Sequence, residues 1–122
     1  MCSRCIPILL LLFILPSTNA FTQNEYKVVC VGFYNFENLF DTVDEPIKND
    51  EEFTPDGASQ YTEERYGTKL ENLATVVSRM GTEITPDGVA ILGICEIENR
   101  KVLEDFVNHP LIAHRNYQIV HY

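Results

Sequence analysis

The stretch VAILGICEIEN, residues 89–99, decides the fold class of this 122-residue chain. Its first seven residues, 89–95, form a continuous apolar run that follows a Pro-Asp-Gly turn sequence. A run of this length after a turn is typical of a strand buried inside a sheet, whereas helices usually need about 10 or more residues. The first charged residue, Glu96, therefore stands where the predicted strand ends.

One strand and one helix are predicted ahead of this run. Residues 26–36 (YKVVCVGFYNF) are rich in β-branched and aromatic side chains, which favours a strand buried on both faces. Residues 41–57 are polar and acidic, and we expect a surface loop with solvated acids. Thr62 is expected to cap a helix that ends near Gly81. Apolar residues recur along this helix at steps of three and four: Tyr66, Leu70, Leu73, Val77 and Met80.

The order strand, helix, strand predicts a βαβ unit with parallel strands and a right-handed crossover, with or without another strand between them. Asn99 is then expected to cap a short helix that stops near Pro110. Residues 117–122 (YQIVHY) predict a third strand. The expected fold class is α/β, in the sense of a mixed α+β domain that begins with a βαβ unit.

Polar residues close both strands of this unit. Asn35 stands at the end of the first strand, within the sequence YNFEN, and Glu96 at the end of the second. Ligands bind beyond the carboxyl ends of strands in open parallel sheets, so we expect the two residues to lie level at neighbouring strand ends. A buried charge without a partner costs about 3 kcal/mol or more, so Glu96 needs a cation or another partner there.

Structural roles remain open for these residues. Glu96 also fits a carboxylate that caps the following helix or pairs with Arg100. Asn35 also fits an amide that closes a turn at the strand end. Glu98 shares the face of Glu96 if the strand continues past it, which would make Glu98 a second metal ligand or a residue that supports one.

Cysteine and histidine do not indicate a separate site. Cys30 and Cys95 should lie several residues apart along neighbouring strands, at about 3.3 Å per residue, which is beyond disulfide reach. We therefore expect buried free thiols. The histidines form no metal-ligand spacing and are interpreted as structural or solvated: His109, His114 and His121.

Residues 1–20 have the pattern of an export signal. Arg4 precedes an apolar run at residues 6–16, and Thr18 and Ala20 would occupy the cleavage positions −3 and −1. The apolar run is shorter than the roughly 20 residues that span a bilayer, so no stable membrane anchor is expected. The mature chain should begin at Phe21 and be exported to the periplasm or the exterior.

The chain is acidic, with a formal net charge of −9. Non-specific binding to nucleic-acid phosphates needs clustered Lys or Arg, which this composition disfavours. Phosphoester chemistry is not excluded, because metal sites for that chemistry are built from carboxylates and a divalent ion reverses the local charge.

Two segments resemble the endonuclease/exonuclease/phosphatase superfamily, which has the deoxyribonuclease-I-like fold, in its exported bacterial branch. They are VGFYNFENLFD, residues 31–41, and ILGICEIENRKVLEDF, residues 91–106. Their order, on consecutive predicted strand ends, makes the signal specific, and the resemblance covers roughly residues 27–122. It implies a four-layer α/β/β/α sandwich, in which two sheets pack face to face with helices outside.

The resemblance implies a metal-dependent phosphoester hydrolase, of the nuclease, phosphodiesterase or phosphatase kind. The residue matching Glu96 binds a divalent metal, usually Mg²⁺ with Mn²⁺ or Ca²⁺ as alternatives, and the residue matching Asn35 helps to position the metal and the scissile phosphate. The expected partner is a phosphoester substrate, with nucleic acid among the candidates. No oligomeric state is indicated.

The Asp-x-Asn and Ser-Asp-His segments that complete the family's site do not occur in residues 1–122. The resemblance therefore implies that residues 21–122 are the N-terminal portion of an incomplete domain and inactive alone. The alternative is a small exported α/β binding or interaction domain without catalysis, in which Glu96 and Asn99 only cap a helix.

Overall fold

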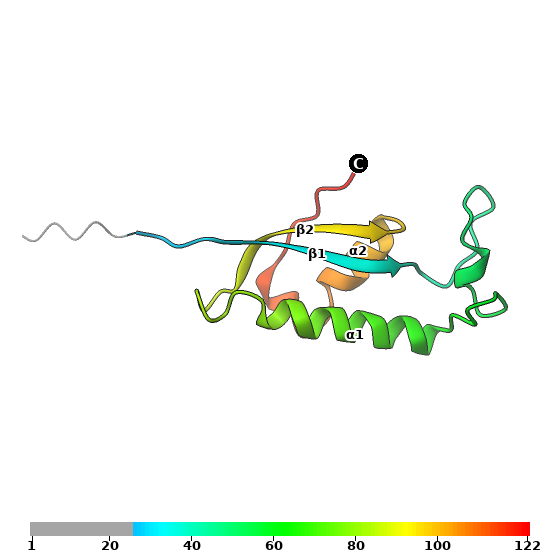
Figure 1. The fold of residues 1–122 in the computed structure, drawn as a ribbon, viewed down its shortest axis with the longest axis horizontal. Coiled ribbons are helices and arrows are strands. Elements are labelled where there is room, and N and C mark those ends of the chain that lie inside the picture. The colour runs from blue at the N-terminus through cyan, green and yellow to red at the C-terminus, as the bar shows by residue number, and fades with distance from the viewer. Residues whose placement is uncertain (1–25) are drawn as a thin grey trace, which may run out of the picture.

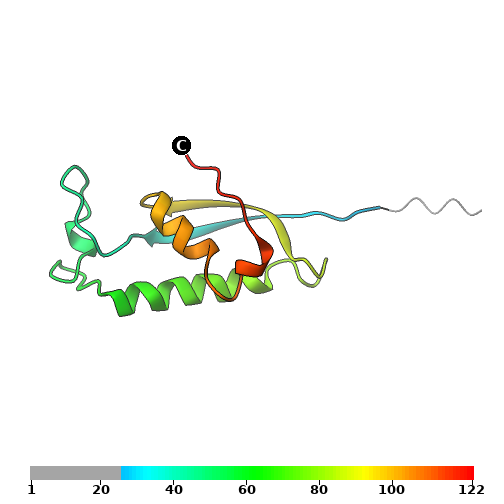
Figure 2. The ribbon, with the colours of Figure 1, turned by 180° about the vertical axis from the view of Figure 1, so that it is seen from behind.

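The computed structural model describes residues 26–122, so the expected export signal at residues 1–20 lies outside the described part. The chain forms a two-stranded sheet with two α-helices on one of its faces (Figures 1 and 2). In chain order the elements are β1 (Cys30–Leu39), η1 (Glu51–Phe53), α1 (Glu63–Arg79), β2 (Val89–Ile97), α2 (Arg100–Val107) and η2 (Ala113–Arg115). Among residues 26–122, no helix combines the length and apolar character needed to cross a membrane.

The two strands confirm the predicted βαβ unit. β1 and β2 pair directly and in parallel, without a strand between them. Their register runs from Cys30 opposite Val89 to Asn35 opposite Cys95. β1 begins four residues later than the expected 26–36 and continues to Leu39, past an irregularity in the register after Asn35.

Both helices begin at the predicted caps. The side chain of Thr62 accepts a hydrogen bond from the main-chain N–H of Arg65 at the start of α1. Asn99 does the same at the start of α2, where the N–H of Val102 donates to its Oδ1 at 3.1 Å. Gly81 follows α1 with φ +76°, a left-handed conformation that glycine adopts without steric cost. Local sequence therefore sets where the helices begin and end.

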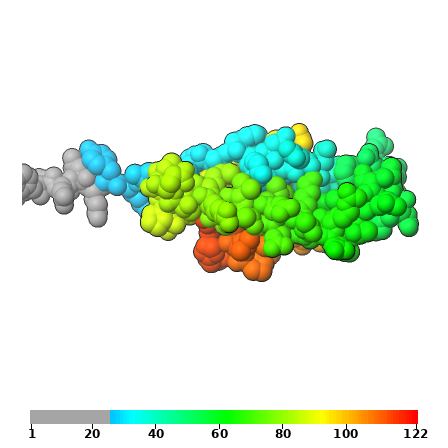
Figure 3. Space-filling model, turned by 60° about the horizontal axis from the view of Figure 1, so that its bottom comes forward, coloured from blue at the N-terminus to red at the C-terminus, as the bar shows by residue number. Residues whose placement is uncertain are grey.

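The core lies between the sheet and the helices. Phe36 on β1 is fully buried and meets Phe106 of α2 edge to face, with ring centroids 4.8 Å apart. Leu73 and Val77 of α1 belong to the same buried cluster. In the space-filling view, α1 lies between β1 on one side and α2 on the other (Figure 3). One continuous core thus joins all four main elements.

The opposite face of the sheet is open, which corrects the expectation that the first strand is buried on both faces. Val31 and Phe33 of β1 are 66% and 70% exposed, and Ile91 of β2 is 61% exposed. In a strand, alternate side chains point to opposite faces, so these residues share the face away from the helices. No element formed by residues 26–122 covers that face.

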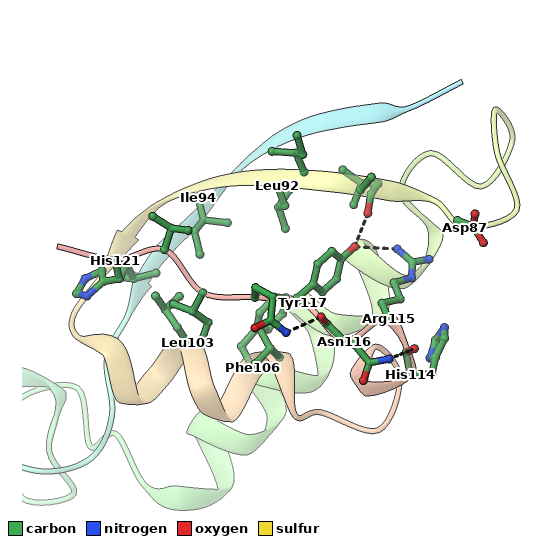
Figure 4. Close-up of a pocket in the computed structure, with 18 of the residues that line it drawn as sticks. Asp87, Leu92, Ile94, Leu103, Phe106, His114, Arg115, Asn116, Tyr117 and His121 are labelled. Atoms are coloured by element: carbon green, nitrogen blue, oxygen red, sulfur yellow. Dashed lines mark hydrogen bonds between the residues drawn. The ribbon is translucent and has the colours of Figure 1, made fainter. Parts of the chain in front are cut away.

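The third strand predicted at residues 117–122 is wrong, because these residues form no strand in the structure. The segment begins at Tyr117, whose hydroxyl donates to the main-chain oxygen of Val89 at 2.6 Å. Further along, the segment and β2 border a hollow of about 1040 Å³, and Val120 remains 79% exposed (Figure 4). Aromatic and β-branched composition favours a strand only where a partner edge is in pairing distance.

Cys30 and Cys95, the cysteines within residues 26–122, are free, as expected, but they are half-buried and not fully buried. Cys30 lies opposite Val89, whereas Cys95 lies opposite Asn35. The two sulfur atoms are thus separated along the strands, which agrees with the absence of a disulfide between Cys30 and Cys95.

Replacing the cap Asn99 with alanine should lower the free energy of unfolding by about 1 kcal/mol, because the N–H of Val102 loses its acceptor. Asn99→Ser keeps a capping oxygen but not the Nδ2 group that donates to Asp41, so it should restore the part of the loss that is due to capping. The matched control is Asn72→Ala on the exposed side of α1, which should leave stability equal or slightly higher. Urea denaturation measures all three variants, and an Asn99→Ala protein as stable as the parent would contradict the capping role.

Candidate functional site

The side chains of Asn35 and Glu96 meet at the carboxyl ends of the two strands. Asn35 Nδ2 donates to Glu96 Oε1 at 2.7 Å, and both residues are exposed. Asn35 pairs in register with Cys95, the residue before Glu96. The expectation that these two residues lie together at neighbouring strand ends is therefore confirmed as geometry.

The orientation of the Asn35 amide is fixed from its other end. The main-chain N–H of Glu37 donates to Asn35 Oδ1 at 2.7 Å, so the oxygen must face the main chain and the nitrogen must face Glu96. Asn35 thus presents donors to its surroundings while Glu96 presents acceptors. In this arrangement the amide holds the carboxylate in place, and the carboxylate carries the oxygen atoms that a hard metal ion prefers.

Unusual backbone conformations surround this pair. Glu37, Asn38 and Glu96 have φ values of 50°, 60° and 57°, all in the left-handed region. That region costs about 1–2 kcal/mol for a residue with a Cβ atom, although Asn tolerates it better. Such residues persist where surrounding contacts hold them, and they occur often at functional sites. Here they bulge β1 and turn the chain at Glu96.

Lys69 of α1 supplies one of the contacts that hold the bulge. Its Nζ donates to the main-chain oxygens of Glu37 and Asn38, the second at 2.8 Å. Burial lowers the pKa of Lys69, and the nearby carboxylates of Glu37 and Glu96 oppose that effect. Sequence reasoning missed Lys69, because a lysine between apolar helix positions has the same signature as a solvated one.

Glu98 would share the face of Glu96 only if the strand continued to it, and β2 ends before it, at Ile97. The left-handed conformation of Glu96 breaks the alternation of side chains, so Glu98 turns inward and its side chain is only 2% exposed. Its Oε2 accepts from the main-chain N–H of Asp41 at 2.9 Å, and its Oε1 lies 3.4 Å from Lys48 Nζ. Burial raises the pKa of Glu98, while the hydrogen bond from Asp41 lowers it.

The loop at residues 41–57 is likewise not simply a solvated acidic face. Asp41 and Asp50 are buried. Asp41 accepts from the N–H of Val43 at 2.8 Å and from Asn99 Nδ2 at 3.1 Å. Asp50 accepts from the N–H of Glu45 at 3.2 Å. The loop acids therefore tie the start of this loop to the cap of α2, next to the strand ends.

Glu96 neither caps α2 nor pairs with Arg100 in the structure. Asn99 caps α2, and Arg100 pairs with Glu104 at 2.9 Å. None of the ion pairs formed within residues 26–122 includes Glu96. Glu96 instead pairs with an amide and borders the hollow beside β2.

No preformed metal cluster occurs in the described part of the chain. Across residues 26–122, no group of three or more His, Cys, Asp or Glu side chains is arranged to hold a metal ion. His109 serves a loop, where its Nδ1 lies 3.4 Å from the main-chain N–H of Leu111. His114 and His121 line the hollow in Figure 4, and neither forms a hydrogen bond with Asn35 or Glu96.

Comparison with known protein families agrees with this fold. The model of the Endonuclease/Exonuclease/phosphatase family matches residues 30–122, which is most of the chain. The chain therefore belongs to this family of phosphoesterases and nucleases, and its mixed α/β fold with a parallel sheet is consistent with the N-terminal part of the family fold. No curated protein and no solved structure matched the chain.

Proposed function

We propose that this chain carries the metal-binding strand ends of a phosphoester hydrolase, with Glu96 as ligand of a divalent ion and Asn35 as the residue that orients it. The hydrogen bond of 2.7 Å between Asn35 Nδ2 and Glu96 Oε1 carries the proposal. Membership of the family supports the reaction class. The position beyond the carboxyl ends of parallel strands supports a ligand site.

The residues present fit Mg²⁺. This ion keeps several waters and is usually bound through one or two carboxylates together with substrate phosphates, so a single glutamate is a sufficient protein ligand. Glu96 is exposed, and no cationic side chain of residues 26–122 pairs with it. Mn²⁺ and Ca²⁺ share the preference for oxygen ligands and are the alternatives.

Each residue of the pair has a distinct task in this proposal. A bound ion would polarise a phosphoryl oxygen and offset charge on the leaving group. Glu96 holds the ion with its carboxylate. Asn35 keeps that carboxylate in one orientation, and the second N–H of its amide is free to donate to a phosphate oxygen. The substrate class is a phosphoester, and the net charge of −9 favours small phosphoesters over long nucleic acid.

Metal binding tests the proposal directly. Titration of the chain with Mn²⁺, followed by electron paramagnetic resonance, should give a site that Mg²⁺ displaces. Glu96→Gln keeps the shape but removes the charge, and should weaken Mn²⁺ binding by about tenfold or more. Glu71→Gln is the matched control, because Glu71 is exposed on α1 and should leave the affinity unchanged. Equal affinity of the parent chain and Glu96→Gln would refute Glu96 as ligand.

Export is part of the proposal. N-terminal sequencing of the protein from the periplasm or the medium should find Phe21 as the first residue, within a residue or two. Ala20→Arg, which removes the small residue at the cleavage position, should make the precursor accumulate. An intact Met1 on a cytoplasmic product of the parent sequence would overturn this prediction.

A further inference from the structure

The bulge of β1 at Glu37 and Asn38 lies between α1 and the candidate site. Of the α1 side chains, only Lys69 donates to this bulge, and it contacts two consecutive main-chain oxygens, those of Glu37 and Asn38. Both residues have left-handed backbones. A bulge re-aims the neighbouring side chains of its strand, so a contact that holds the bulge also decides where those side chains point.

The bulge in turn orients Asn35. The main-chain N–H of Glu37 donates to Asn35 Oδ1, and the nitrogen of the same amide donates to Glu96 Oε1, each at 2.7 Å. Rotation of the Glu37 peptide would remove the N–H that donates to Asn35 Oδ1, so the amide nitrogen would no longer be held toward Glu96. The chain of contacts therefore runs from Lys69 to Glu37, then to Asn35, and ends at Glu96.

We infer that Lys69 is a positioning residue for the Asn35–Glu96 pair, and that it acts through the main-chain oxygens of the bulge. The effect on metal affinity rests on the proposed function, whereas the effect on the Asn35 amide does not. An ammonium group suits this task, because it has three donors, enough for both main-chain oxygens at once. Groups that orient a metal ligand from outside its shell typically change metal affinity by about 10–100-fold.

Lys69→Met keeps the length of the side chain but removes the donors. In nuclear magnetic resonance spectra, the Asn35 side-chain amide signals of the parent chain should be shifted and slow to exchange, and in Lys69→Met they should move to the values of a solvated amide. Affinity for Mn²⁺ should fall about tenfold or more. Lys69→Arg, which restores donors, should recover most of the parent Asn35 amide shifts and most of the Mn²⁺ affinity. Lys101→Met is the matched control, since Lys101 pairs with Asp105 on α2.

The outcomes separate this inference from the proposed function. Unchanged Asn35 signals in Lys69→Met overturn the inference, even if the parent chain binds Mn²⁺. A parent chain that binds no Mn²⁺ refutes the metal site, while the Asn35 signals still decide the role of Lys69. Thermal unfolding shows whether the variant is folded, and Lys69→Gln, with one uncharged donor group, takes its place if Lys69→Met is not. An equal shift of the Asn35 amide signals in Lys101→Met would also overturn the inference, because the shift would then not be specific to Lys69.

Discussion

Hydrolysis of a phosphodiester should fall by about 10²–10³-fold when Glu96 is replaced by glutamine, the loss typical of removing one group that stabilises a transition state. The substitution keeps the volume of the side chain but removes the charge that a divalent ion requires, and with it the orientation of the bound phosphate. The measurement is turnover of a chromogenic phosphodiester, with Mg²⁺ and with a chelator, by a protein that joins this chain to the Asp-x-Asn and Ser-Asp-His segments of the family.

Two further variants sharpen this test. Glu96→Asp retains the charge on a shorter side chain, so it should lose less activity than Glu96→Gln only if the ion can shift toward it. Glu71→Gln removes an exposed carboxylate from α1 and should leave turnover unchanged. Full activity of the Glu96→Gln protein would mean that Glu96 has only a structural role at the end of β2.

Replacing Phe36 with alanine should lower the free energy of unfolding by about 3–5 kcal/mol. Phe36 is fully buried, and its ring meets both Phe106 and Tyr34 edge to face, so truncation leaves a cavity where the sheet joins α2. Small domains are stable by about 5–15 kcal/mol, so this loss would remove most of the stability of a domain at the lower end of that range. Urea denaturation at several temperatures measures it.

The same strand offers the control. Phe33 lies three residues earlier on β1, and it is 70% exposed on the open face of the sheet. Phe33→Ala removes the same atoms but little buried surface, and its cost should stay within about 1 kcal/mol. Similar losses from the two substitutions would contradict the assignment of the core to the helix-covered face.

The candidate site could be predicted in part. The positions of Asn35 and Glu96 followed from two apolar runs that each end in polar residues, because parallel strands bring their carboxyl ends to one edge of the sheet. The conformation at these ends could not be predicted. Three left-handed residues decide that Asn35 faces Glu96 and that Glu98 turns away, and nothing in the sequence Glu-Asn or Glu-Ile requires a positive φ.

The fold, like the candidate site, could be predicted only in part. Helix limits, caps and the apolar stripe of α1 depend on residues at most four positions apart, so they could be predicted from local sequence. The exposed face of β1, the unpaired segment at residues 117–122 and the contact of Lys69 with the bulge depend on residues that are distant in the chain. These features are defined only once the chain has folded, because strand pairing and burial require a partner surface whose presence local sequence does not encode.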